Sequence, residues 1–240
     1  MNELAIHREA VRLLEAWSGF EAVETALGDL PELEVYLGGG ALRGVLLGDD
    51  RPVKDFDLFV DGPCLDQLVG RLEKGGRIEY TPYGSPRWFP RPNGSPYADL
   101  IPVTRFTNGL WPCKDILDAL NQVDCTINAA AINLRTAAFL DPQNGRYDAA
   151  QRVMRTSLFD IPATPICPRA EVTHAGALWH RLLHYACVLG LRIEPTTARW
   201  LSEHRPAETQ SLRFAEMFFV PRLDLARGLW RAGGGTFPAT

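Results

Sequence analysis

The stretch YLGGGALRGVLLGDDRPVKDFDLFV, residues 36–60, decides which fold the chain is expected to adopt. It reads as a short strand, a glycine turn, a helix that ends at Gly48 and a second strand, FDLFV. Side chains alternate along a strand, so Asp55 and Asp57 point the same way and bring two carboxylates close together. Two negative charges at such a short distance repel each other unless a cation lies between them. Mg²⁺, which prefers oxygen ligands, would supply that cation.

The glycines ahead of the predicted helix favour a site for phosphate groups. Gly39 and Gly40 let backbone amides approach a ligand without an intervening Cβ, and the helix offers unpaired N–H groups and a positive dipole end. Arg43, in the first turn, adds a fixed positive charge suited to phosphate oxygens. The alternative is that the glycines form a structural turn and that Asp55 and Asp57 are the solvated face of an edge strand.

A third carboxylate, Asp99, lies inside the later strand-like run YADLIPV. An acidic residue in such a run needs a reason, and a role as a further metal ligand supplies one. Tyr97 shares its face, so a shift of register would exchange the two residues.

The rest of the chain predicts an α+β head followed by an all-helical domain. Prolines lack the backbone donor that regular structure needs, so the proline-rich stretch at 81–96 is not expected to hold regular structure for long. The elements expected from spacing and composition are helices in residues 1–30 and at 63–74, strands at 77–80 and 97–103, mainly helix at 114–134, a strand running into a turn at 137–148, and helices from about 150 onward, the clearest within 172–191.

Composition narrows the classes of protein to consider. The chain has 240 residues, is 46% hydrophobic and carries a net charge of −4, so no global basic field drives nucleic-acid binding. The charged N-terminus resembles an amphipathic helix rather than a secretory signal, and no apolar run is long enough to cross a bilayer, which predicts a cytoplasmic protein without a membrane partner. The five cysteines are widely spaced without a CxxC pair and are expected to be reduced and mostly buried.

Four ordered motifs extend the pattern beyond the opening stretch, and together they resemble a known family. LGGGALRGVLLGDDRPVKDFDLFV is similar to the signature of the DNA polymerase β-like nucleotidyltransferase superfamily, specifically the head domain shared by bacterial class II CCA-adding tRNA nucleotidyltransferases and poly(A) polymerases. The later motifs are VDCTINAAAINL, which resembles RRDxxxNA, FLDPQNG, which resembles a DPxxG turn, RVMRT, and YACVLGLRIEPTT, which resembles the neck motif RFAxxLGFxIxPET.

The resemblance implies a role for each matching residue. Asp55 and Asp57 would be metal ligands, with Asp99 as the third carboxylate that activates the acceptor hydroxyl. Gly39, Gly40 and Arg43 would hold the triphosphate. Asp124 and Asn128 would match the Asp and Asn of RRDxxxNA, which contact the incoming nucleotide; the alternative is that they only cap and stabilise a local turn.

Departures from the family pattern put the substrate in doubt. Gln122 and Val123 replace two arginines. His174, Ala175 and Leu178 stand where the family's EDxxR template selects the base. Arg181 stands at one neck arginine position and His184 at another.

Two other groups of residues are candidate sites. His180 and His184 lie four apart on a predicted helix, but without further ligands this spacing is usual for packing. Trp88 and Phe89, flanked by Arg87 and Arg91, either stack on an RNA base or pack on the head.

We therefore expect a polymerase β-like head (31–156) with a small mixed sheet flanked by helices, preceded by a helical segment (1–30) and followed by a short all-helical neck-like domain (157–240). The expected activity is Mg²⁺-dependent transfer of a nucleotide from a nucleoside triphosphate to an acceptor hydroxyl, with the 3′ end of tRNA or a smaller RNA as the favoured acceptor. The alternatives are transfer onto a protein or small molecule, and a silent relative that only binds nucleotide or RNA. No sequence feature indicates an oligomeric state.

Overall fold

The structure is a computed structural model that describes residues 2–81, 84–91, 96–106, 110–166 and 171–223. Their elements, in chain order, are α1 (Glu3–Glu15), α2 (Phe20–Gly28), β1 (Glu34–Gly38), α3 (Gly39–Leu47), β2 (Asp55–Asp61), α4 (Leu65–Gly75), β3 (Gly76–Tyr80), β4 (Pro86–Pro90), β5 (Tyr97–Pro102), η1 (Val103–Arg105), α5 (Ile116–Leu120), η2 (Thr126–Asn128), β6 (Ala131–Asn133), β7 (Phe139–Leu140), α6 (Gly145–Ala150), β8 (Val153–Met154), α7 (His174–Leu189), β9 (Arg192–Ile193), α8 (Pro195–Glu203) and α9 (Glu208–Met217).

The contacts divide the chain into two units, and the chain passes between them more than once. The first unit comprises residues 1–122 and 128–146, and the second comprises 123–127 and 147–240. The N-terminal helices thus belong to the same unit as the sheet, and the second unit begins earlier than the domain boundary predicted at 156 and 157.

A seven-stranded sheet forms the centre of the first unit, in the order β3-β4-β5-β2-β1-β6-β7. Strands β2 and β5 pair in parallel, and the other neighbouring pairs are antiparallel. The α+β class and the mixed sheet are therefore confirmed, and the sheet is larger than the small one that was predicted.

The opening stretch folds as its sequence indicates, into β1, α3 and β2. Helix α3 begins at Gly39 directly after β1, and Gly48 ends it in the left-handed conformation, with a φ of 64°. Strand β2 then returns antiparallel to β1, so that Gly38 lies opposite Asp57. Because the strands are adjacent, the glycine turn is brought next to the aspartates that follow it in sequence.

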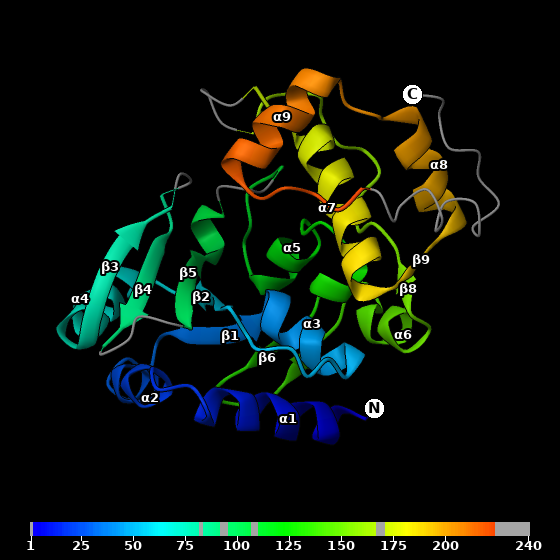
Figure 1. Cartoon of the computed structure of the whole chain (residues 1–240). Coiled ribbons are helices and arrows are strands. Elements are labelled where there is room, and N and C mark those ends of the chain that lie inside the picture. The colour runs from blue at the N-terminus through cyan, green and yellow to red at the C-terminus, as the bar shows by residue number, and fades with distance from the viewer. Residues whose placement is uncertain (1, 82–83, 92–95, 107–109, 167–170, 224–240) are drawn as a thin grey trace. The chain divides into compact units, whose positions relative to one another are not determined.

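Helices α1 and α2 run along one side of the sheet (Figure 1). Helix α1 buries Ile6, Ala10 and Leu14, and the ring of Trp17, which follows it, stacks on Phe56 of β2 with centroids 4.5 Å apart. The even-numbered residues of β2 therefore belong to the core, since burial of such apolar side chains is the main stabilising contribution in a domain of this size. The odd-numbered residues are left on the other face.

The second unit is mainly helical, with α7, α8 and α9 as its long elements. It also contains a two-stranded parallel sheet, β8 with β9, so the prediction of an all-helical domain missed these short strands. Thr173 caps α7 by accepting a hydrogen bond from the Gly176 amide at 3.0 Å, and Glu194 caps α8 in the same way through Thr197.

Two predicted elements differ from the structure. Residues 114–134 were expected to be mainly helix, but they form the five-residue α5, the turn η2 and strand β6. Strand β6 pairs with β1 through Leu37 and Ile132, so sheet pairing overrides the helical preference of the alanines. The proline-rich stretch also contains a strand, β4, which is possible because its two prolines lie at its ends.

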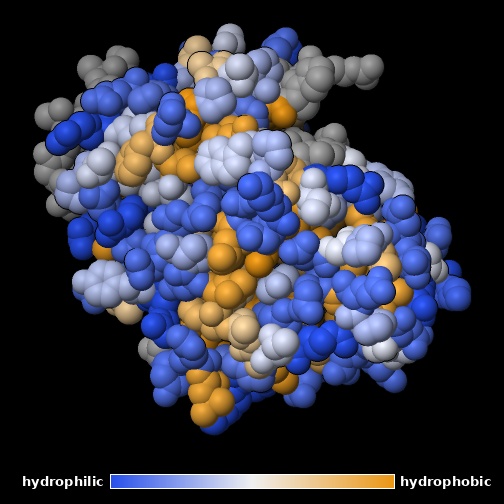
Figure 2. All heavy atoms as spheres, turned by 180° about the vertical axis from the view of Figure 1, so that it is seen from behind, coloured by the Kyte–Doolittle hydropathy of each residue, from blue (hydrophilic) through white to orange (hydrophobic). Residues whose placement is uncertain are grey.

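The surface, the helix lengths and the cysteines can each be compared with what the composition predicts. Hydrophilic residues cover most of the face shown in Figure 2, with apolar atoms visible between them. Within the described residues, no helix is both long and apolar enough to span a membrane. Cys113, Cys125 and Cys187 are buried free thiols and Cys64 is a partly exposed one, as expected, while Cys167 lies outside the described residues.

Candidate active site

The three aspartates predicted from the sequence lie on one face of the sheet. Along β2, Asp55 and Asp57 alternate with buried Phe56 and Leu58. Strands β2 and β5 pair in parallel so that Asp57 lies directly opposite Asp99, and residues opposite each other share a face. Asp55, Asp57 and Asp99 therefore lie on the same face of the sheet. Phe56 lies on the opposite face, where its ring packs against Trp17.

The glycine turn holds Asp57 directly. The backbone N–H of Gly40 donates to Asp57 Oδ2 at 3.2 Å. Gly39 has a φ of 58°, and a Cβ built on it would lie 1.8 Å from the same oxygen. Only glycine satisfies both the left-handed backbone and this close approach. The N-terminus of α3 and the carboxylate of Asp57 are thus parts of one arrangement.

Arg43 and Asn128, both predicted to contact the nucleotide, are in contact with each other. Arg43 Nη1 donates to Asn128 Oδ1 at 2.8 Å, although 85 residues separate them in sequence. Asn128 is buried and ends the turn η2, while Arg43 lies at the start of the second turn of α3 and is partly exposed. The hydrogen bond fixes the guanidinium near the glycine turn, where it can meet an anionic ligand.

Asp99 is held by an arginine that the sequence analysis placed in a possible RNA-stacking patch. Arg87 of β4 lies opposite Asp99, and it donates from Nε to Oδ1 at 2.6 Å and from Nη2 to Oδ2 at 2.9 Å. The hydrogen bonds to Asp99 raise the pKa of Arg87 above its usual value. Both carboxylate oxygens of Asp99 therefore have a cationic partner.

Tyr97 connects this pair to the first aspartate. Its hydroxyl donates to Asp55 Oδ2 at 2.9 Å, and the Arg87 guanidinium lies 4.4 Å from the centre of its ring. Burial, the negative charge of Asp55 and the hydrogen bond to it together raise the pKa of Tyr97. The phenol therefore stays protonated at neutral pH and remains a donor to Asp55.

The donor set at this face suits a hard divalent cation. Asp55 and Asp57 offer carboxylate oxygens, the ligands that Mg²⁺ prefers, and Mg²⁺ commonly binds through one or two carboxylates together with substrate phosphates. Among the described residues, no group of three or more His, Cys, Asp or Glu side chains is arranged to hold a metal ion. The residues therefore fit a metal site that bound phosphates would complete.

Asp124 belongs to the second unit, not to the unit that carries the other predicted site residues. Arg181 of α7 donates from Nε to Asp124 Oδ2 at 2.7 Å, and the Asp124 side chain is 9% exposed. This ion pair compensates the charge of the Asp124 carboxylate within the second unit. The prediction that Asp124 also contacts a nucleotide remains a prediction.

The remaining candidates of the sequence analysis have structural explanations. His180 is fully buried, with Nδ1 2.7 Å from the Gly176 carbonyl oxygen and Nε2 2.9 Å from Ser211 Oγ, as expected for a packed histidine rather than a metal ligand. Trp88 is also fully buried, so it packs in the head and does not offer a stacking surface. Ala175 and Leu178, at the template positions, are buried on α7.

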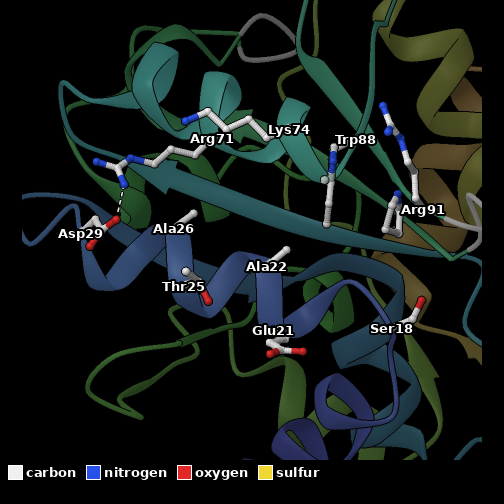
Figure 3. A pocket seen from close by; sticks show the side chains of 12 residues that line it. Ser18, Glu21, Ala22, Thr25, Ala26, Asp29, Arg71, Lys74, Trp88 and Arg91 are labelled. Atoms are coloured by element: carbon white, nitrogen blue, oxygen red, sulfur yellow. Dashed lines mark hydrogen bonds and ion pairs between the residues drawn. The ribbon is translucent and has the colours of Figure 1, made fainter.

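A cavity of about 450 Å³ lies on the other face of the sheet, between α2 and α4 (Figure 3). Trp88 and Pro90 of β4 line it, and they alternate with Arg87 and Phe89, which point to the aspartate face. Arg71 of α4 is paired with Asp29, just after α2, at its rim. This cavity is therefore separate from the aspartates.

The comparison of the sequence with known proteins gives relatives but no family model, since none matches. Two curated relatives are called multifunctional CCA protein. The one from Xanthomonas oryzae pv. oryzae is 32% identical over 181 residues, which are 71% of this chain and 40% of the relative. The one from Haemophilus ducreyi is 30% identical over 132 residues, 51% of this chain and 30% of the relative. The chain thus spans less than half the length of these relatives.

Solved structures share the fold. A CCA-adding enzyme in complex with CTP superimposes with a TM-score of 0.65 at 18% identity, over 93% of this chain and 55% of that one. The Thermotoga maritima CCA-adding enzyme complexed with tRNA gives a TM-score of 0.63 at 18% identity, over 93% and 54%. A tRNA nucleotidyltransferase with a primer tRNA and an ATP analogue gives 0.60 at 21% identity, over 88% and 60%. The resemblance drawn from the motifs is confirmed.

Proposed function

We propose, from the likeness of this chain to the class II CCA-adding enzymes in sequence and fold, that it transfers a nucleotide from a nucleoside triphosphate to an acceptor hydroxyl and releases pyrophosphate. The observation that carries the proposal is the contact between the glycine turn and the aspartate pair. The Gly40 amide binds Asp57, so an anion-binding helix terminus and a cation-binding carboxylate lie side by side.

Each residue of this face has a proposed task. Asp55 and Asp57 would hold Mg²⁺, which neutralises developing charge on phosphate oxygens. The N–H groups at the start of α3 and the guanidinium of Arg43 bind the triphosphate, and Asn128 orients Arg43 through the hydrogen bond at 2.8 Å. Phosphoryl transfer requires mainly positioning and charge neutralisation, which these groups supply.

Asp99 has the proposed task of assisting the acceptor hydroxyl, and Asp124 that of contacting the nucleotide. For Asp99 to accept a proton, an oxygen that now binds Arg87 has to become available. Asp124 would act from its ion pair with Arg181. Both assignments come from the motif resemblance, and the variants Asp99→Asn and Asp124→Asn address them separately.

The proposed acceptor is the 3′ end of an RNA such as tRNA. Structures with this fold include complexes with CTP, with ATP and with a primer tRNA, which supports a nucleoside triphosphate and tRNA as the substrates. The proposed location is the cytoplasm, as expected from the sequence.

A second candidate is transfer onto a protein or small molecule. It is favoured by two of the three template positions of α7, since Ala175 and Leu178 are apolar and buried and have no side-chain group with which to select a base, which leaves His174 alone with a polar side chain there. Incubation with each of the four labelled nucleoside triphosphates, with total tRNA in one reaction and a protein extract in another, separates the two candidates by the fraction that becomes labelled.

The transferase proposal itself is tested by the variants Asp55→Ala and Asp57→Ala. Each removes a proposed metal ligand, so we expect incorporation of labelled nucleotide to fall by at least about a thousandfold, equivalent to about 4 kcal/mol of transition-state stabilisation. Circular dichroism should show an unchanged fold, because both side chains are only partly buried. Full activity in either folded variant would refute the assignment.

A further inference from the structure

The side chain of Arg87 makes more contacts on the aspartate face than an exposed surface arginine usually does. It binds both oxygens of Asp99 in a bidentate pair, and the two residues are opposite each other on adjacent strands. The side chains are 32% exposed for Arg87 and 15% exposed for Asp99. A planar guanidinium that is paired with a carboxylate and also covers an aromatic ring, here that of Tyr97, loses little additional freedom on being held there.

The charges on this face can be compared with what a metal ion needs. Asp55, Asp57 and Asp99 carry three negative charges, and the pair with Arg87 neutralises one of them. A divalent cation held by Asp55 and Asp57 would meet the charges of the two aspartates of β2. Without Arg87, all three carboxylates would face a bound cation.

We propose that Arg87 is a positioning residue that acts as a fixed cation beside Asp99 and thereby directs divalent metal binding to Asp55 and Asp57. The inference rests on the proposed function for its relevance to catalysis, but it concerns binding of the metal alone. Asp99 is kept aligned by Arg87 and is not a ligand of the ion bound in the absence of nucleotide.

The arrangement around Arg87 explains how it also affects Asp55. The Arg87 guanidinium covers the ring of Tyr97, whose hydroxyl donates to Asp55. One arginine thus holds the partner of the first aspartate as well as the carboxylate opposite the second. We therefore expect the fixed cation both to keep Asp99 out of the metal site and to set the orientation of Asp55.

The test is a titration of the purified protein with Mn²⁺ in the absence of nucleotide, with free Mn²⁺ measured by electron paramagnetic resonance. Mn²⁺ replaces Mg²⁺ at carboxylate sites. In Arg87→Met the positive charge is lost and Asp99 is released, so we expect Mn²⁺ to bind tighter by on the order of tenfold. Arg87→Lys keeps the charge and should bind Mn²⁺ as the unchanged protein does.

The double variant Arg87→Met/Asp99→Asn is the decisive one. It removes the pair without changing the net charge of the face, so Mn²⁺ affinity should stay within about threefold of that of the unchanged protein, which is about 0.7 kcal/mol. If Asp99 is a metal ligand instead, the double variant binds Mn²⁺ much more weakly, which overturns the proposal.

Arg77→Met provides a matched control. Arg77 lies on the neighbouring strand β3 and stacks on Phe89 at 4.5 Å, but its ion pair is with Glu79 and not with an aspartate of the face. Its removal should leave Mn²⁺ binding unchanged. Unchanged or weaker binding in folded Arg87→Met also overturns the proposal. Because the readout needs no transfer reaction, a negative result here is distinguishable from failure of the transferase assignment.

Discussion

At the scale of single residues, each aspartate of the face is held by a group from a different element. Tyr97 of β5 donates to Asp55, the Gly40 amide of α3 donates to Asp57, and Arg87 of β4 binds Asp99. These partners fix the orientation of three carboxylates before a ligand arrives. Such preorganisation lowers the cost of arranging charges during a reaction.

Gly39 is the residue whose replacement should disturb this arrangement most selectively. In Gly39→Ala the new Cβ would lie 1.8 Å from Asp57 Oδ2, and the residue would keep a φ of 58° that alanine disfavours. We expect loss of Mn²⁺ binding and of nucleotide incorporation, together with a decrease of about 1–3 kcal/mol in the free energy of unfolding. Isothermal urea unfolding and the labelling assay measure the two effects.

Gly48→Ala is the control for backbone strain alone. Gly48 has nearly the same φ, 64°, but a Cβ there meets nothing within 4 Å. We expect a destabilisation of about 1 kcal/mol with incorporation retained. Equal loss of activity in both variants would show that strain in α3, and not the contact with Asp57, is responsible.

The residue spacing was sufficient to predict part of this face. The alternation of FDLFV placed Asp55 and Asp57 on one side, and the same reasoning for YADLIPV placed Asp99 and Tyr97 together, as the structure has them. The contact of Arg43 with Asn128 joins positions far apart in sequence, so no local pattern could predict it. The pairing of Arg87 with Asp99 was missed because the strand that carries Arg87 was not recognised.

At the scale of elements, the errors concern two strands, β6 and β4, whose local sequence indicates another structure. Residues 128–133 are all buried, so β6 shows no polar face and its alanines resemble a helix. Strand β4 does alternate, with Pro86, Trp88 and Pro90 buried, but its prolines indicate a loop. Both strands are defined by their neighbours in the sheet, which short-range patterns do not contain.

Helices α7 and α9 are joined by a buried histidine, which should make their packing sensitive to pH. The His180 ring stacks on Phe214 at 4.6 Å and its Nε2 lies 2.9 Å from Ser211 Oγ. Burial lowers the pKa of His180 below the value of 6.5, so the folded chain keeps the ring neutral while the unfolded chain takes up a proton. The stabilisation is complete above about pH 6.5 and is lost as the pH falls below it.

We expect His180 to contribute at most about 1.4 kcal/mol of lost stability per pH unit below that value. Urea unfolding between pH 7.5 and 5.5 measures the slope for the unchanged protein and for His180→Gln, in which the slope should be smaller. His174→Gln is the control, since His174 is only partly buried although burial lowers its pKa as well. An identical slope in His180→Gln would exclude His180 as its source.

At the scale of the whole molecule, the chain passes from the first unit into the second for a short segment and then returns to the first. Residues 123–127 belong to the second unit, and the chain then returns to the first for 128–146. This segment makes three interactions within the second unit. The backbone of Cys125 forms an isolated β-bridge with that of Thr156. Asp124 forms an ion pair with Arg181, and the Thr126 hydroxyl donates a hydrogen bond to Asp148. The second unit is therefore incomplete without residues 123–127, which precede residues 128–146 of the first unit in the chain.

This topology predicts which fragments fold. A fragment of residues 147–240 lacks Thr126, whose hydroxyl donates to Asp148 Oδ2 at 2.7 Å, and Asp148 is only 2% exposed. It also lacks Asp124, so Arg181 loses its carboxylate partner. A hydrogen bond to a charged group contributes about 1.5–3 kcal/mol, so the loss of both interactions removes a large part of the stability of a small domain.

We therefore expect fragment 147–240 to show little cooperative unfolding, whereas fragment 123–240, which restores Asp124 and Thr126, should unfold cooperatively. Circular dichroism at 222 nm during urea titration distinguishes them. In fragment 123–240, Thr126→Val and Asp124→Asn should each lower the midpoint, because Asp148 then loses the hydrogen bond from Thr126, or Arg181 loses its carboxylate partner. If fragment 147–240 unfolds at the same midpoint as fragment 123–240, the 123–127 segment is not a structural part of the second unit.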